Sequence, residues 1–430
     1  MMRKIASILL FIILLWFLIF STLFAQTKNR FPKPEFESGY IQPQTTTPAP
    51  REAALEAIDV AVLVVTLGLA SYFALKTRSR RALFFLTIFS LVYFGFYRKG
   101  CVCSVGAIQN MVFALVDSTY AIPVTVLLFF ILPLVFALFF GRTFCAAVCP
   151  LGAIQELIIL RPMKISAWLA QTLGIIPYVY LGLTILFAAT GSAFVICRLD
   201  PFVGFFRFGA SFDMLLLGAC FLLMGLFIAR PYCRFLCPYG VLLGWMSRFS
   251  KWHVTITPDD CIQCRLCEES CPFGAIQTPA PKVVPESHRL SKRRLAILIG
   301  LLPVLILVGG WIGANLDTPL SRLHPTIRLA EQVISEDIGK TNETTEESRT
   351  FRSTGTPSTE LFNAALSVRE QFETGGRLLG GFLGLMFGLK LVSLSIRRTR
   401  KDYEPDRTTC FSCARCFSYC PQEHLRLKKS

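Results

Sequence analysis

Long apolar runs are the feature that most constrains what this chain can fold into. Hydrophobic residues make up 53% of its 430 residues and charged residues only 17%, against about 25% charged in soluble domains. Apolar residues rarely alternate with polar ones at a period of two in this sequence, which excludes a porin-like barrel. Eight runs approach the length of about 20 residues that a bilayer-spanning helix needs, at residues 5–24, 53–75, 82–97, 121–140, 173–196, 212–229, 295–312 and 378–396. We therefore expect an α-helical polytopic membrane protein with about seven or eight spans.

The basic residues indicate the orientation of these spans. Lys and Arg number 44 against 28 Asp and Glu, a net charge of +16. In a soluble protein this excess would suggest a nucleic-acid partner. Here the basic residues cluster at the ends of apolar runs, as the positive-inside rule requires of cytoplasmic loops. We therefore expect no nucleic-acid binding, and a multi-pass protein of the inner (cytoplasmic) membrane.

The runs and the polar stretches between them define the expected organisation of the chain. The N-terminal run is either an uncleaved anchor or a signal segment, because it lacks a good small-residue cleavage site. The expected segments are an anchor or signal (1–25), an outer linker (26–52), a transmembrane repeat region (53–250), the first half of a ferredoxin domain (251–290), a helix pair (295–396) with an outer loop (313–376), and the second ferredoxin half (397–430).

Two cysteine runs have the spacing of bacterial ferredoxins. Each fits C-x2-C-x2-C-x3-C-P, in which three thiolates hold one [4Fe-4S] cluster and the fourth ligates another cluster. A structural zinc site would instead need two C-x2-C pairs. The first run consists of Cys261, Cys264, Cys267 and Cys271, and the second of Cys410, Cys413, Cys416 and Cys420.

The expected topology returns both runs to the cytoplasmic side, where they can form one small α+β domain of the bacterial two-cluster type. In such ferredoxins the fourth cysteine of each run ligates the cluster of the other run. We therefore expect Cys420 to complete the cluster of the first run and Cys271 that of the second. The helix pair is then a membrane excursion within a single ferredoxin domain.

Outside the two ferredoxin runs, the motif C-x3-C-P occurs twice, and these two copies indicate a parallel internal repeat. Residues 82–160 and 173–250 share the order of outward span, outer cysteine, inward span and C-x3-C-P. A pseudo-two-fold axis along the membrane normal would bring the two motifs together at the inner face. The tetrapeptide Gly-Ala-Ile-Gln also recurs after a cysteine, at 106–109, 152–155 and 274–277.

The C-x3-C-P cysteines have two interpretations. Cysteines four residues apart share one helical face, so four thiols could converge and bind a metal ion or a further cluster. Alternatively, they are small apolar residues packed at helix starts. The four residues are Cys145, Cys149, Cys233 and Cys237.

Three other cysteines, Cys101, Cys103 and Cys197, fall near the outer ends of spans. They could bind metal or carry out redox chemistry, or they could form a disulfide. Cys220 lies alone within a span and is expected to be a core thiol. Charged residues at the same boundary could line a quinone or partner site, or could simply snorkel to the interface; these are Arg198, Asp200, Arg207 and Asp213.

Motifs for other cofactors are missing from the sequence. There is no G-x-G-x-x-G opening a βαβ unit and no P-loop, so no nucleotide is expected. No general base or nucleophile motif accompanies the cysteines, which favours an electron-transfer component over a stand-alone enzyme. Haem is not expected, since no C-x-x-C-H and no paired spacing within spans is found among His253, His288, His324 and His424.

Paired C-x3-C-P motifs followed by ferredoxin runs resemble the NosR/NapH family of polyferredoxin-like membrane iron–sulfur proteins. The segment Cys101-Val-Cys103-Ser-Val-Gly-Ala-Ile-Gln-Asn110 is similar to the NosR branch. The resemblance covers roughly residues 80–280 and the tail. It implies electron transfer between the quinone pool or the cytoplasm and an extracytoplasmic reductase. The chain departs from NosR in lacking a large outer flavin-binding domain, and from NapH in the C-terminal position of its second run.

An assembly factor is the alternative function. The chain also resembles membrane ferredoxin-like proteins linked to cytochrome oxidase maturation, which implies redox-dependent metal delivery to a respiratory metalloenzyme. Copper bound by Cys101, Cys103 and Cys197 would favour delivery, whereas reduction by quinol without an outer metal would favour the relay. The direction of electron flow depends on cluster potentials, which range from about −700 to +450 mV with their surroundings.

Overall fold

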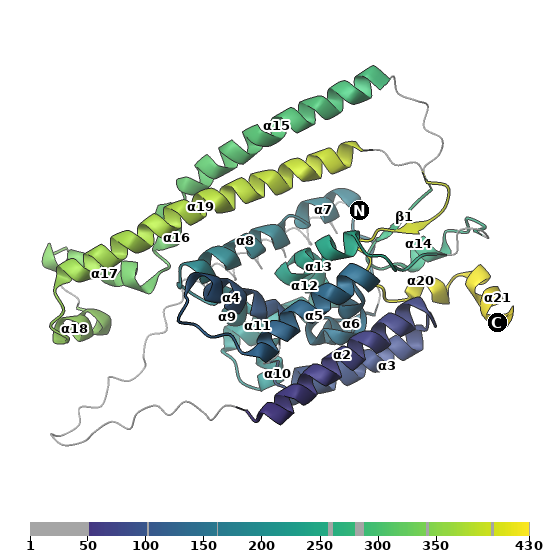
Figure 1. The fold of residues 1–430 in the computed structure, drawn as a ribbon, viewed down its shortest axis with the longest axis horizontal. Helices are drawn as coiled ribbons and strands as arrows, with labels where there is room; N and C mark the ends of the chain where they lie inside the picture. The colour runs from purple at the N-terminus through teal and green to yellow at the C-terminus, as the bar shows by residue number, and fades with distance from the viewer. Residues whose placement is uncertain are drawn as a thin grey trace.

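The computed structural model describes residues 51–100, 103–160, 162–256, 261–279, 288–340, 344–396 and 400–429. Cys101, the segment 1–25 and nearly all of the linker 26–52 lie outside these residues. Elongated helices run side by side between two ends (Figure 1). We call the end that carries residues 261–277 and 403–426 the ferredoxin end, and the end that carries residues 317–353 the distal end.

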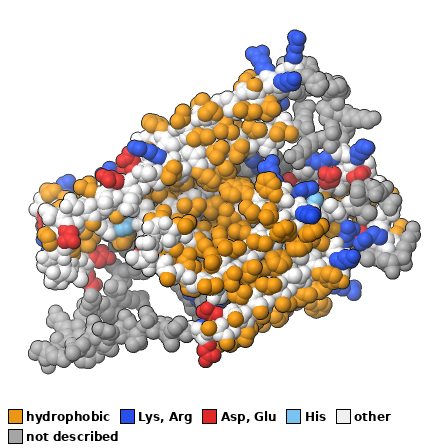
Figure 2. All heavy atoms as spheres, viewed as in Figure 1, with side chains coloured by type: hydrophobic (Ala, Val, Ile, Leu, Met, Phe, Trp, Pro, Cys, Tyr) orange, Lys and Arg blue, Asp and Glu red, His pale blue; other side chains and the backbone are white. Residues whose placement is uncertain are grey.

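Five stretches of the described chain are helical, long and apolar enough to cross a membrane, and hydrophobic side chains cover the face between the two ends (Figure 2). They are α2 (Ala53–Leu75), α3 with η1 (Arg80–Ser90, Leu91–Tyr97), α7 with α8 (Ala167–Leu173, Ile176–Ala189), α15 (His288–Ala314) and α19 (Ser358–Ser395). Shorter apolar helices are α4 (Ser104–Val116), α5 (Val124–Phe140) and α11 (Phe212–Gly225). All expected runs except 5–24, which lies outside the described residues, overlap one of these helices, whereas α4 was not expected. The number of spans stays a prediction.

The connections between these helices are themselves short helices. Two of them, α6 and α13, begin with a proline directly after a cysteine. The connecting helices are η2 (Phe144–Val148), α6 (Pro150–Ile158), α9 (Val195–Leu199), α10 (Val203–Arg207), α12 (Pro231–Phe235) and α13 (Pro238–Arg248).

Glycines hold α15 and α19 together as a hairpin. A Cβ atom added to Gly309 or Gly313 on α15 would overlap the backbone of Gly380 or Gly376 on α19, and one added to Gly384 would overlap that of Leu305. Small residues four apart let two helix backbones touch, which is how helices associate without a hydrophobic driving force in lipid. The close contact therefore depends on the glycines themselves.

We expect Gly380→Leu to separate the hairpin. The leucine would have to displace the backbone of α15, and overpacking of this kind costs about 1–3 kcal/mol or more. Thermal unfolding of the purified protein in detergent measures the loss. Gly300→Leu, on the same hairpin, is the matched control because nothing lies within 4 Å of its Cβ position. Equal unfolding temperatures for the two variants would show that the hairpin does not rely on this contact.

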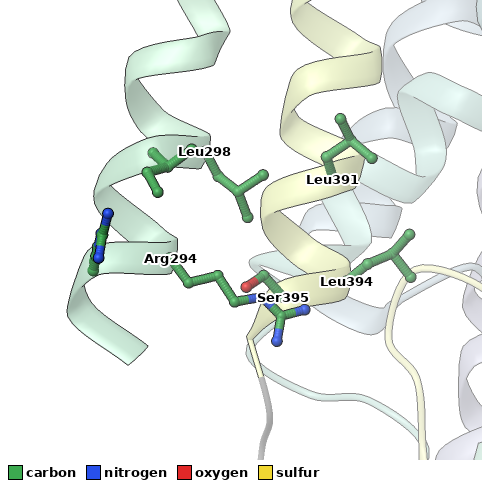
Figure 3. Close-up of a pocket in the computed structure, with 7 residues that line it drawn as sticks. Arg294, Leu298, Leu391, Leu394 and Ser395 are labelled. Atoms are coloured by element: carbon green, nitrogen blue, oxygen red, sulfur yellow. The ribbon is translucent and has the colours of Figure 1, made fainter. Parts of the chain in front are cut away.

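Beyond the glycine contact, a groove opens between α15 and α19 near the ferredoxin end (Figure 3). Arg294 extends across it toward Ser395, while leucines from both helices line its walls. Away from the groove, α15 presents exposed apolar side chains such as Leu307 (73%) and Trp311 (71%). Such exposure suits a helix that faces lipid on most of its circumference.

The segment 313–376 was expected to be an outer loop, and its described residues are largely helical. Three short helices, α16 (Asp317–Ser321), α17 (Pro325–Asp337) and α18 (Glu346–Ser353), precede α19, which begins at Ser358. Ala330 and Val333 of α17 pack against Leu361 of α19. Only a few residues of α17, such as Ile327, Ala330 and Val333, are buried, and most of the others are polar. The helix was therefore not recognised from the pattern of apolar residues.

The two ferredoxin halves form one unit across the hairpin. Strand β1 (Ile276–Gln277) from the first half pairs antiparallel with β2 (Glu404–Pro405) from the second, with Ile276 opposite Pro405. The rings of Phe273 and Phe411, one from each half, lie 4.7 Å apart between centroids. The helices of the unit are α14 (Leu266–Ser270), α20 (Arg415–Ser418) and α21 (Pro421–Lys429).

Candidate iron–sulfur and thiol sites

Both ferredoxin runs adopt the same loop conformation. Gln263 and Arg265 in the first run, and Ser412 and Ala414 in the second, have positive φ angles between 52° and 65°. These residues occupy equivalent positions on either side of the second cysteine. The left-handed conformation is uncommon for residues other than glycine, and here it curls each loop so that its cysteines face a common centre.

The structure brings each fourth cysteine to the opposite run. The thiol of Cys267 lies within electrostatic range of Cys261, Cys264 and Cys420. The thiols of the second run lie within range of Cys271; these are Cys410, Cys413 and Cys416.

The donor set suits clusters rather than single ions. No three His, Cys, Asp or Glu side chains in the described parts of the chain converge closely enough to hold one metal ion. A [4Fe-4S] cluster takes each thiolate at a different iron atom, so its ligands stand further apart. The eight ferredoxin cysteines are thus the kind of donor that iron–sulfur clusters take, and both runs have the ferredoxin spacing.

The C-x3-C-P cysteines do not share one helical face, contrary to expectation. Cys145 lies in η2 and Cys149 caps the next helix, α6, with an extended ψ of 118°. Cys233 lies in α12, and Cys237 caps α13 with a ψ of 112°. The proline after each capping cysteine disfavours the helical conformation there, so each motif turns from one short helix into another.

These four thiols nevertheless meet, and they do so inside the bundle. The sulfur of Cys149 lies within electrostatic range of Cys145, Cys233 and Cys237. Cys149 also lines a small cavity together with Cys103 and with Leu63, which lies midway along α2. Cys149 therefore lies beside residues from the middle of α2, and the position of the motifs relative to the inner face stays a prediction.

The two C-x3-C-P segments interlock reciprocally. Arg230, before the second motif, donates to the backbone carbonyls of Cys145 and Ala146 in the first. A Cβ added to Gly152 would lie 3.3 Å from the guanidinium of Arg230, and one added to Gly240 would lie 3.2 Å from that of Arg142. Each arginine thus occupies the space that the glycine of the other motif leaves open.

Cys103 and Cys197 also lie near each other. Their thiols interact electrostatically, and both interact with the buried carboxylate of Asp200. Neither forms a disulfide in this structure. Of the expected boundary charges, Asp200 is buried and interacts electrostatically with Arg207, while Arg198 and Asp213 are exposed. Cys220 is a partly buried free thiol within α11.

A buried ion cluster joins the thiols to the ferredoxin unit. Glu156 on α6 accepts hydrogen bonds from Arg230 (2.9 Å) and Arg415 (2.7 Å), and it also pairs with Arg80. Burial alone would raise the pKa of Glu156, but the three arginines lower it to about 2. No spacing in the sequence indicates this cluster, whose members come from four separate segments.

Arginines of the C-x3-C-P motifs contact the ferredoxin unit directly. The guanidinium of Arg142 lies 4.4 Å from the ring centroid of Phe411, and that of Arg230 lies 5.8 Å from the same ring. Arg142 also donates to the carbonyl of Thr408 at 2.9 Å. The thiol site and the ferredoxin unit are therefore packed against each other.

Comparisons with known proteins agree with these sites. One 4Fe-4S binding domain model matches twice, at residues 122–167 and 211–257, and a second 4Fe-4S binding domain model matches residues 254–277. The two matches of the first model each contain one C-x3-C-P motif. No solved structure matches the chain.

Three curated relatives are similar in sequence to part of this chain. Protein NirI of Paracoccus denitrificans is 32% identical over 183 residues, 39% of this chain and 27% of NirI. YccM of Escherichia coli is 29% identical over 189 residues, 39% of this chain and 52% of YccM. Regulatory protein NosR of Stutzerimonas stutzeri is 28% identical over 208 residues, 44% of this chain and 28% of NosR.

The chain is similar to NosR/NapH-like ferredoxin-type proteins over less than half of its own length. The resemblance of the cysteine motifs to this family is thus confirmed. Its 4Fe-4S binding domain matches and its long apolar helices are those of a membrane protein with iron–sulfur domains, and they support an electron-transfer role. The matched regions span about half or less of the length of the three relatives named above.

Proposed function

We propose that the protein relays single electrons across a membrane, between a quinone or redox protein on one side and a reductase on the other. The observation that carries this proposal is the unbroken series of thiol groups along the bundle. It begins with the ferredoxin cysteines, continues through the C-x3-C-P cysteines and ends with Cys103 and Cys197.

Each step of this series is supported by packing. Arg230 interacts electrostatically with Cys413 of the ferredoxin unit and with Cys233 of the thiol site. Cys149 and Cys103 line the same cavity. When bound, [4Fe-4S] clusters supply one-electron carriers, while this chain holds them in place and keeps the interior dry.

The ligands follow from the same geometry. We assign one cluster to Cys261, Cys264, Cys267 and Cys420, and the other to Cys271, Cys410, Cys413 and Cys416. Cys145, Cys149, Cys233 and Cys237 would hold a further metal or cluster. Cys103 and Cys197, with Cys101 beyond the described residues, would bind metal near the other end of the series.

The parallel repeat and the orientation are part of the proposal. The reciprocal contacts of Arg142 and Arg230, and the two matches of one family model, support a duplication of residues 82–160 and 173–250. Basic residues gather at the ferredoxin end, among them Arg78, Arg80 and Arg294. By the positive-inside rule, this end faces the cytoplasm of the inner membrane.

Reconstitution in liposomes tests the relay. The protein is inserted with an electron acceptor sealed inside and a reductant outside, with quinone supplied, and reduction of the acceptor is followed by absorbance. We expect reduction that depends on the protein and on intact clusters. No transmembrane reduction, with clusters present by EPR, would contradict the relay.

Redox-dependent metal delivery to a respiratory metalloenzyme is the second candidate. The observation that favours it is the position of Cys103 and Cys197 beside the Asp200 carboxylate, since thiolates are good ligands for Cu(I). Metal delivery would be the better supported function if these two cysteines bound copper stoichiometrically and the protein failed the liposome assay.

A further inference from the structure

One heptapeptide pattern recurs at three places in the chain, two of which have the same local structure. Cys103, Cys149 and Cys271 are each followed by glycine at the third position and by Gly-Ala-Ile-Gln from there on. In the first two copies the cysteine is the N-cap of a helix, α4 or α6. Cysteine, glycine and glutamine therefore lie along one side of that helix.

The second copy forms hydrogen bonds with the other C-x3-C-P motif. Gln155 is fully buried, and its side-chain oxygen accepts a hydrogen bond from the backbone N–H of Tyr232 at 3.1 Å. Its amide nitrogen donates to the sulfur of Cys233 at 3.3 Å. The glycine of this copy lies beside the same cysteine, since a Cβ on Gly152 would be in ordinary contact with that sulfur, at 3.7 Å.

The first copy makes the corresponding backbone contacts with the segment of Cys197. The side-chain oxygen of the fully buried Gln109 accepts from the backbone N–H groups of Ile196 (3.0 Å) and Cys197 (3.3 Å). A Cβ on Gly106 would lie 3.4 Å from the sulfur of Cys197. The amide nitrogen of Gln109 has no hydrogen-bond partner among the described residues, although buried polar groups are nearly always paired.

The third copy joins the ferredoxin halves. Gln277 donates to the carboxylate of Asp406 at 2.8 Å. Asp406 in turn accepts from the backbone N–H of Cys410 through its carbonyl at 2.9 Å. In all three copies the glutamine thus reaches a segment that carries a cysteine of another part of the chain.

We infer that Cys-x-x-Gly-Ala-Ile-Gln is a latch that sets the position of a cysteine from another segment, with Gln109 and Gln155 as positioning residues for Cys197 and Cys233. The amide nitrogen of Gln109, which has no partner among the described residues, would donate to one of these sulfurs as that of Gln155 does to Cys233. The inference rests on the proposed function only in taking these thiols as ligands.

Thiol bridging tests the latch at Cys103 and Cys197. Full-length protein with Cys101→Ser, treated with a chelator, is reacted with dibromobimane, and peptides bridged between Cys103 and Cys197 are quantified by mass spectrometry. We expect Gln109→Leu to lower the bridging rate about tenfold, because two buried N–H groups lose their acceptor. Gln109→Glu keeps an acceptor oxygen and should restore most of the rate.

The exposed Gln171→Leu is the control and should bridge like the parent protein. Iron–sulfur absorbance, which depends on the distant ferredoxin unit, reports whether each variant is folded; if Gln109→Leu fails to fold, Gln109→Ala with Gln109→Glu is compared instead. An unchanged bridging rate without the glutamine oxygen, or no bridging in the parent, would overturn the latch. A latch that holds while the liposome assay fails would count against the relay alone.

Discussion

Cys420→Ser is expected to destroy the cluster held by the first ferredoxin run while leaving the cluster of its own run in place. Cys420 lies with Cys267 and its neighbours, and a serine cannot replace the fourth thiolate well. Iron and sulfide analysis should show loss of about half of the ferredoxin clusters. EPR of the reduced protein should lose the signal of one cluster.

Cys271→Ser is the matched variant and should remove the other signal. Cys271 lies with Cys410 and Cys413 of the second run. The two variants therefore should lose different EPR signals, each assigned by comparison with Cys264→Ser and Cys413→Ser. If Cys420→Ser resembled Cys413→Ser rather than Cys264→Ser, the crossed ligation would be refuted.

Glu156→Gln is expected to cause the largest loss of stability among single substitutions outside the cysteines. It leaves Arg80, Arg230 and Arg415 around an uncharged group, and breaking a buried ion pair costs about 3–5 kcal/mol. Chemical unfolding in detergent measures the change. Glu331→Gln is the control, since its pair with Arg322 is exposed and worth less than about 1 kcal/mol. Similar losses for both would show that the cluster is not structural.

The Glu156 carboxylate also predicts how the stability of the folded protein decreases at low pH. The pKa of Glu156 is about 2 in the folded protein against an ordinary 4.5, so its contribution is complete above pH 4.5. It is lost as the pH falls toward 2, by an amount of about 3 kcal/mol. Wild-type stability should therefore fall over this range more steeply than that of Glu156→Gln. If stability fell equally with pH in the wild type and in Glu156→Gln, other groups would be responsible for the loss at low pH.

Much of the fold follows from local signals in the sequence. Apolar runs coincide with helices because a bilayer-facing helix must be apolar over a length that the bilayer sets. The pairing of β1 with β2 agrees with the expected meeting of the two ferredoxin halves. Helix α17 was missed because its packing on Leu361 needs only a few apolar residues within a polar segment.

The cysteine motifs could be recognised in the sequence, but the side chains that surround them could not. Cysteine spacing identifies ligand runs, since the chain must wrap each cluster locally. The turn of Cys149 into the bundle depends on how Pro150 and Arg230 pack, and these contacts join residues far apart in the sequence. Glu156 carries no motif, and its importance comes entirely from three arginines that the fold brings to it. The glutamine of Gly-Ala-Ile-Gln could be recognised as part of a repeat, but the residues to which it hydrogen-bonds could not be predicted from the sequence.

The hairpin between the ferredoxin halves imposes an order on biogenesis. The sheet and the ring pair of Phe273 with Phe411 need both halves, and α15 and α19 lie between them in the chain. During synthesis, the ferredoxin unit therefore cannot close until both hairpin helices have entered the membrane. Iron–sulfur assembly would then act as a late checkpoint, because only a chain whose hairpin has been inserted with both ends on one side can present the complete set of ligands.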